Sequence, residues 1–181
     1  TWKAYMEDLP APCSLVAAAN GYALKHDPFL YFHGIRDDSR RCHQVVPLSA
    51  LGPDLATNTV ASFVWITPNL THDTHDSDVA TGDAWLHDLV PRILASSAWQ
   101  QGGLLLLTWD EGANAAGCCG AAGGGRVATL AIAPGMRPGS RTDRPADHYS
   151  LLRALEDAWD LPPLGHAATA DGRWLADLVA R

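Results

Sequence analysis

One apolar run that ends in two adjacent carboxylates constrains the fold of this 181-residue chain more than any other feature. The run is LLLLTW at residues 104–109, and Asp110 and Glu111 follow it directly. A continuous apolar segment of this length predicts a strand that is buried on both faces of a parallel sheet. Since ligands of open α/β proteins bind beyond the carboxyl ends of such strands, Asp110 and Glu111 are candidate ligands of a divalent cation: Ca, Mg, Mn or Zn. A solvated turn is the alternative interpretation.

Hydrophobic patterns elsewhere in the chain predict further strands and an α/β fold, with a mostly parallel sheet and flanking helices. Strands are expected at residues 61–67, 104–109 and 127–133. Three strands make a thin sheet for such a fold. Either further strands lie in the first sixty residues, which look irregular, or part of the domain lies outside this chain.

Helices are expected in three places. A short one is expected at residues 14–19. Asp83 is expected to cap a second helix that runs to about residue 94 and is kinked at Pro91. The third is expected to begin near Asp147 or Ser150 and to end near Trp159.

The composition is that of a globular protein that can bury a core. Hydrophobic residues make up 47% of the chain, and its length predicts one domain over residues 1–181. A net charge of −7 argues against a nucleic-acid partner, because such surfaces are basic. No stretch reaches the roughly 18 apolar residues that a transmembrane helix needs, and the first residues have no signal-peptide pattern.

The four cysteines predict either disulfides or free thiols rather than a structural zinc site, because no C-x-x-C pair is present. Cys13 and Cys42 flank an aromatic segment and are expected to form a bridge if the protein is exported. Cys118 and Cys119 are adjacent. They form either a strained vicinal bridge or two buried thiols.

Residues 71–78 follow a predicted strand and contain two histidines and three aspartates in eight positions. Histidine and carboxylate together can bind a metal, act as a base with its orienting partner, or contact phosphate oxygens. The alternative is a loop whose aspartates cap its own turns and the next helix.

Two further segments place cationic side chains where an anion could bind. Lys25 and His26 precede a turn that Pro28 fixes. His148 lies at the expected start of a helix, where backbone N–H groups already favour an anion. The chain has no G-x-S-x-G, G-x-G-x-x-G or P-loop motif.

Five segments, in this order along the chain, resemble the bacterial phosphoesterase family. That family contains non-specific phospholipases C and acid phosphatases, and it falls within the alkaline-phosphatase superfamily. The segments are KHDPFLYF at 25–32, WITPNL at 65–70, HDSDVATGDAWL at 75–86, TWDEG at 108–112 and HYSLLR at 148–153.

The resemblance implies an alkaline-phosphatase-like fold and a metal-dependent phosphomonoesterase or phospholipase C-like phosphodiesterase. Asp110 and Glu111 match the metal-binding pair of the family. His26 and His75 match residues that contact the phosphoryl group or protonate the leaving oxygen. Lys25 stands where some relatives have a second histidine, and it is expected with His148 to bind substrate. The implied substrate is a small phosphate ester or a phospholipid headgroup, and the implied location is secreted or periplasmic.

One departure from the family pattern is large. In the family, a Glu-Asn metal motif and the Ser or Thr nucleophile precede the segment that resembles residues 2–10. The chain is therefore expected to be the C-terminal part of a longer enzyme, incomplete at its N-terminus. A truncated relative that binds a phosphate ligand or a partner protein without catalysis is the alternative. A hydrolase that uses metal-bound water is a third interpretation.

Overall fold

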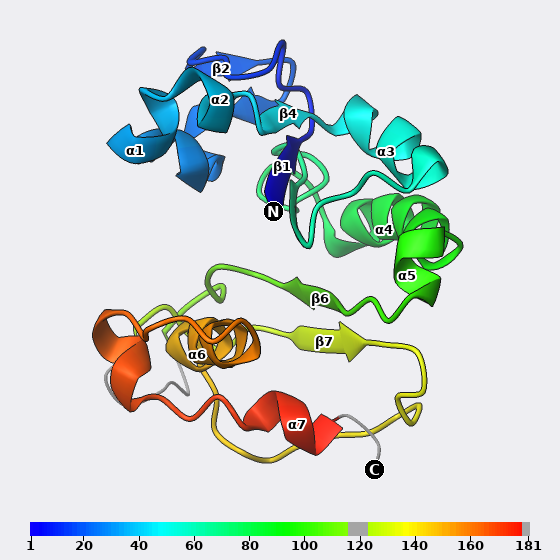
Figure 1. Ribbon diagram of the computed structural model, residues 1–181, viewed down its shortest axis with the longest axis vertical. Helices are drawn as coiled ribbons and strands as arrows, with labels where there is room; N and C mark the ends of the chain where they lie inside the picture. Colours follow the sequence, from blue (N-terminus) through cyan, green and yellow to red (C-terminus); the bar gives the residue numbers. More distant parts are fainter. Residues whose placement is uncertain (116–122, 179–181) are drawn as a thin grey trace. The chain divides into compact units, whose positions relative to one another are not determined.

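The computed structural model describes residues 1–115 and 123–178 (Figure 1). The chain divides into two compact units, Thr1–Gln101 and Gly102–Arg181. The expected single domain stays a prediction.

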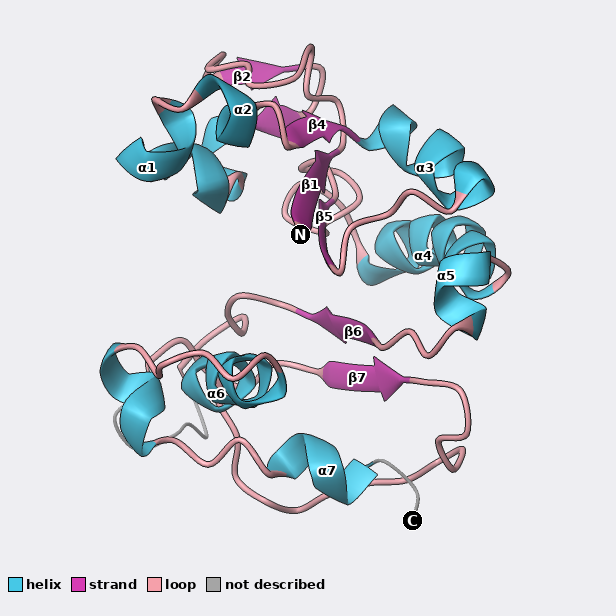
Figure 2. Cartoon of the chain, in the orientation of Figure 1, coloured by secondary structure: helices cyan, strands magenta, loops and turns pink. Residues whose placement is uncertain are grey.

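Unit 1 is built on a parallel sheet in the order β4-β1-β5 (Figure 2). The strands are β1 (Trp2–Met6), β4 (Val45–Pro47) and β5 (Phe63–Thr67). The sheet and its helices confirm the predicted α/β class. β5 was predicted at residues 61–67. β1 and β4 lie in the first sixty residues, where further strands were one of two possibilities and had no predicted position.

β1 is the central strand, and its side chains alternate between two apolar cores. Tyr5 is fully buried with Leu51 and Leu89 on one face, while Ala4 and Met6 are buried on the other face. This alternation is the two-residue period of an extended strand. Figure 1 shows α3, α4 and α5 on one side of β1, and α1, α2 and β2 on the other.

The helices that cover the Tyr5 face are α3 (Leu51–Thr57), α4 (Val79–Leu94) and α5 (Ser97–Gln100). α4 begins one turn earlier than expected, so the prediction of Asp83 as its cap was wrong. Asp78 is the N-cap, and its Oδ1 accepts the backbone N–H of Thr81 at 2.9 Å. Pro91 lies within α4, as expected.

The opposite face carries short elements. They are η1 (Leu24–His26), η2 (Pro28–Tyr31), α1 (His33–Arg36) and α2 (Ser39–Cys42). A further short turn, η3 (Leu48–Ala50), precedes α3.

The prediction of a helix at residues 14–19 was wrong, because part of that segment forms a hairpin. β2 (Ala18–Ala19) pairs antiparallel with β3 (Tyr22–Ala23). The turn is Asn20-Gly21, with φ of 51° and 97°. Asn-Gly is the preferred pair for a two-residue hairpin turn, because both positions need positive φ.

Unit 2 contains the strands β6 (Leu105–Thr108) and β7 (Thr129–Ile132), which pair antiparallel. The prediction that the 104–109 run is a parallel strand buried on both faces was therefore wrong, since its pairing is antiparallel and its side chains are only half-buried. The helices are α6 (His148–Ala158), η4 (Gly165–Thr169) and α7 (Trp174–Leu178).

α6 begins where the sequence predicted. Asp147 is its N-cap, with Oδ1 accepting the backbone N–H of Ser150 at 2.8 Å. Trp174 is 4% exposed, and its Nε1 donates to the Ser150 carbonyl at 3.1 Å, which ties α7 to α6.

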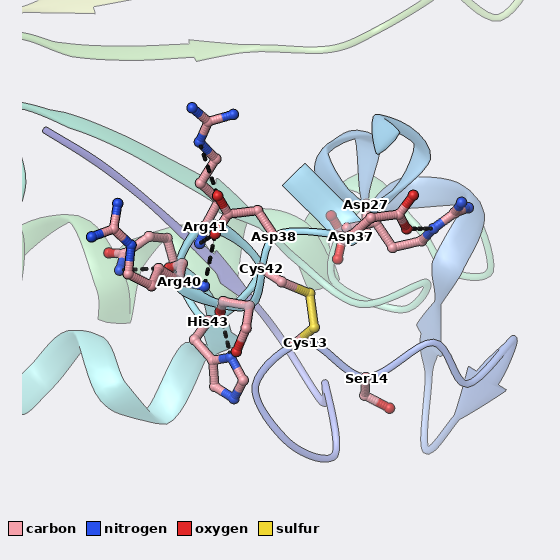
Figure 3. Close-up of a disulfide and its surroundings, with 12 residues drawn as sticks. Cys13, Ser14, Asp27, Asp37, Asp38, Arg40, Arg41, Cys42 and His43 are labelled. Carbon is pink, nitrogen blue, oxygen red and sulfur yellow. Dashed lines mark hydrogen bonds and ion pairs between the residues drawn. A yellow bond between two sulfur atoms is a disulfide. The ribbon is translucent and has the colours of Figure 1, made fainter. Parts of the chain in front are cut away.

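The expected disulfide between Cys13 and Cys42 is present (Figure 3). Asp38 caps α2 next to it by accepting the backbone N–H groups of Arg40 and Arg41. Cys118 and Cys119 lie outside the described residues. In the part of the chain that the structure describes, no helix is both long and apolar enough to cross a membrane.

Replacing both Cys13 and Cys42 with alanine should lower the free energy of unfolding by about 2–4 kcal/mol, because the bridge closes a loop across 29 positions. Urea unfolding monitored by tryptophan fluorescence measures the change. The wild type under reducing conditions, which keeps both sulfur atoms, is the control. Equal midpoints for variant and oxidised wild type would contradict a stabilising role.

Candidate active site

The candidate residues of unit 1 gather at the carboxyl end of its parallel sheet. Glu7 follows β1, and the loop of residues 68–78 follows β5 and leads into α4. Ligand sites of open α/β proteins occupy this edge. A small hollow here is lined in part by Glu7, His26 and Thr67.

Glu7 is the acceptor on which three segments converge. Its carboxylate is 15% exposed, and it accepts the Asn69 backbone N–H and the Trp85 Nε1–H, each at 2.9 Å. His72 Nδ1 lies 2.9 and 3.0 Å from its two oxygens. A carboxylate can only accept, so His72 carries its proton on Nδ1, and in the neutral ring Nε2 is left with a lone pair.

The structure brings His26 and His75 together, although 49 positions separate them in the sequence. Their ring centroids are 5.9 Å apart. Asp73 links them, because its Oδ2 lies 3.0 Å from His26 Nδ1 and its Oδ1 accepts the His75 backbone N–H at 2.7 Å. His75 Nδ1 in turn lies 2.7 Å from Asp76 Oδ1. Each imidazole is therefore oriented by its own carboxylate.

The loop that carries His75 is backbone-strained between Asp73 and His75. Thr74 has φ of 73°, which is unfavourable for a β-branched residue. Gly82 on α4 makes room for this loop, because a Cβ there would lie 2.6 Å from Thr74 Cγ2 and 3.1 Å from the His72 carbonyl oxygen. Strain of this kind persists only where the surrounding contacts impose it.

Lys25 and Asp27 flank His26 in opposite environments. Lys25 is exposed, while the Asp27 side chain is completely buried. Burial raises the pKa of Asp27 to about 6, against the opposing effect of the Tyr22 hydroxyl 3.3 Å away. Asp27 Oδ1 has no hydrogen-bond partner among the described residues.

The candidate residues of unit 2 lie around the end of β6. Asp110 and Glu111 are exposed, and Asp110 Oδ1 accepts the Glu111 backbone N–H at 2.9 Å. His148, the first residue of α6, has Nε2 2.8 Å from the Asp110 carbonyl oxygen. His148 therefore anchors the backbone of the acidic pair, a contact that the sequence did not indicate.

The acidic pair fits a hard divalent cation in chemistry, because carboxylate oxygens are the ligands that Ca²⁺, Mg²⁺ and Mn²⁺ prefer. Asp110 and Glu111 would supply only part of a coordination shell. Over residues 1–115 and 123–178, no three His, Cys, Asp or Glu side chains converge into a metal site. Further ligands would have to come from elsewhere.

Sequence reasoning missed Glu7 as a site residue. Glu7 stands directly after a strand, as Asp110 does, but β1 was not recognised as a strand. Its partners lie 62, 65 and 78 positions away in the sequence.

This arrangement defines an α/β protein with carboxylate-oriented histidines at its sheet edge. A model of the Phosphoesterase family matches residues 1–162. The chain belongs to the phosphoesterase family, as the motifs indicated.

Several curated proteins are similar to this chain. Phosphatidylinositol-3-phosphatase of Mycobacterium tuberculosis is 30% identical over 172 residues, which cover 94% of this chain and 52% of the relative. Phosphate-repressible acid phosphatase of Penicillium chrysogenum is 28% identical over 173 residues, which cover 91% of this chain and 40% of that relative. Acid phosphatase of Aspergillus fumigatus is 28% identical over 174 residues, which cover 91% of this chain and 38% of that relative. The chain thus spans between about two fifths and half of these relatives.

Replacing Asp27 with asparagine should make stability less dependent on pH. The pKa of Asp27 in the folded protein, about 6, lies above its value in the unfolded chain. The contribution of Asp27 to the free energy of unfolding is therefore fully present below about pH 4 and is lost as the pH rises through 6. Asparagine stays neutral. As the pH rises from about 4 to 6, the free energy of unfolding of the variant should therefore increase relative to that of the wild type, by up to about 3 kcal/mol.

Urea unfolding at several pH values measures this difference. The exposed Asp88→Asn is the control, for which we expect no such trend. A difference between Asp27→Asn and wild type that stays constant with pH would contradict the raised pKa.

Proposed function

We propose that the protein containing this chain is a metal-dependent phosphoric ester hydrolase. The observation that carries the proposal is the His26 and His75 pair, oriented by Asp73 and Asp76 at the carboxyl end of the sheet. Membership of the phosphoesterase family supports the same reaction.

The two histidines would act on the phosphoryl group and the leaving oxygen. Catalysis of phosphoryl transfer depends mainly on positioning and on compensating negative charge at the phosphoryl oxygens. With Nδ1–H of each ring donating to an aspartate, Nε2 is the atom left to face the substrate: it accepts a proton in the neutral ring and donates one only when the ring is protonated. Lys25, exposed beside His26, would add positive charge for an anionic substrate.

Asp110 and Glu111 would bind the divalent metal ion, whose identity we leave open among Ca, Mg, Mn and Zn. When bound, it would supply Lewis-acid stabilisation of phosphoryl oxygens. His148 would hold the backbone of this pair through the Asp110 carbonyl, in addition to the substrate-binding role that the motif implies.

The substrate we propose is a phosphate monoester, either a small molecule or a phospholipid headgroup. Relatives carry the names acid phosphatase and phosphatidylinositol-3-phosphatase, both of which denote removal of phosphate. We also propose that the hydroxyl nucleophile and the remaining metal ligands belong to a part of the protein that precedes these residues.

We propose an exported protein, either secreted or periplasmic. The support is the disulfide between Cys13 and Cys42, since such bridges persist in oxidising compartments.

Replacing Asp110 with alanine in the complete protein should lower kcat for 4-nitrophenyl phosphate at least about 100-fold, the usual cost of losing a strong electrostatic stabiliser. Steady-state kinetics with and without added divalent metal measure the effect. The variant should also bind the metal more weakly in calorimetry. Unchanged activity and metal binding would overturn the assignment.

Replacing His75 with glutamine should lower kcat by about 100-fold or more, because a positioned general acid or base contributes at least that much. His87, which is exposed on α4, provides the matched control. His87→Gln should stay within about twofold of the wild type. Equal activities for the two variants would remove His75 from the reaction.

A further inference from the structure

Glu7 holds together three segments that are far apart in the sequence. Its Oε2 accepts the backbone N–H of Asn69 after β5, its Oε1 accepts Nε1–H of Trp85 on α4, and both oxygens lie near Nδ1 of His72. The Glu7 backbone N–H also donates to the carbonyl of Thr67 at 2.9 Å. A single carboxylate therefore binds the N-terminal part of the loop that carries His75 and the helix that follows this loop.

A short series of hydrogen bonds connects Glu7 to the histidine pair. Asn69 Oδ1 accepts the backbone N–H of His72 at 2.9 Å, and the Asn69 carbonyl accepts the backbone N–H of Asp73 at 2.9 Å. Asp73 then contacts His26 and the backbone of His75. Moving Asn69 would therefore move Asp73, which orients the His26 imidazole and holds the backbone of His75.

The left-handed backbone of Thr74 gives an independent reason to expect an anchor here. A β-branched residue relaxes out of this conformation unless its neighbours are held. Glu7 holds the loop on the N-terminal side of Thr74, through Asn69 and His72. On the other side, the backbone N–H of Asp76 donates to the Leu70 carbonyl at 2.8 Å.

We propose that Glu7 is a positioning residue: its carboxylate fixes the loop of residues 69–76 and the Nδ1–H tautomer of His72, and so keeps His26 and His75 in their paired arrangement. Its effect on turnover rests on the proposed hydrolase function. Its effect on the histidines does not.

The sharpest test is Glu7→Gln in the complete protein. Glutamine keeps the length and shape of the side chain, but its NH₂ group cannot accept a hydrogen bond, so at least one of the three donors loses its partner. We expect the ¹⁵N spectrum of selectively labelled histidines to show a changed Nδ1/Nε2 pattern for His72 and shifted signals for His26 and His75. We expect kcat to fall about tenfold or more, with KM within about twofold.

Asp54→Asn is the matched control. The Asp54 side chain is 19% exposed, a fraction similar to the 15% of Glu7. Its carboxylate accepts hydrogen bonds from Lys3 Nζ and the Tyr5 hydroxyl, each at 2.6 Å, and both donors lie on β1 rather than in the loop of residues 69–76. This variant should lose a comparable amount of stability and leave all three histidine spectra unchanged. A purely structural role for Glu7 predicts that the two variants behave alike, and that result would overturn the proposal.

If Glu7→Gln does not fold, Glu7→Asp replaces it, because aspartate keeps the charge and shortens the side chain by one methylene. Changed His72, His26 and His75 signals together with a lowered kcat would support the proposal, and an unperturbed set of histidine signals would overturn it. If the wild type hydrolyses no phosphate ester while the histidine signals still respond to Glu7, the proposed function fails and the positioning role stands.

Discussion

The pairing of β1 on both sides is the constraint on which the rest of unit 1 depends. β4 and β5 each form a parallel ladder with β1, and its side chains are buried on both faces. A strand held in this way ends at a defined point, so Glu7 begins the next segment at the edge of the sheet. The residues that follow β5 meet it there because parallel strands share a carboxyl end.

Two acidic side chains near this edge differ in their burial and in their hydrogen bonds. Glu7 collects N–H donors from three segments, which compensates the loss of water around its charge. Asp27 is buried more completely, and its Oδ1 lacks a partner among the described residues, so burial raises its pKa to about 6. Of the two, Glu7 is the carboxylate whose hydrogen bonds connect separate segments of the chain.

Local patterns were sufficient for β5, for most of α4 and for α6, because each has strong periodicity or a clear cap. β1 was missed because WKAYM has no β-branched residue and includes a lysine, whose charge is paired with Asp54. Pairing and burial override the low strand preference of Lys3 and Ala4 within this segment. The hairpin at Asn20-Gly21 carried a recognisable turn signal that the apolar residues beside it obscured.

The sequence by itself determined the chemical inventory of this protein: the histidine and aspartate loop, the acidic pair after an apolar run, and the family to which these motifs belong. Only the tertiary structure decided that His26 lies beside His75, that Asp73 connects them, and that Glu7 receives Asn69, His72 and Trp85. The reason is physical. Hydrogen bonds between residues more than sixty positions apart leave no periodicity in the chain, and those of Glu7 form because β1 and β5 run parallel and end at the same edge.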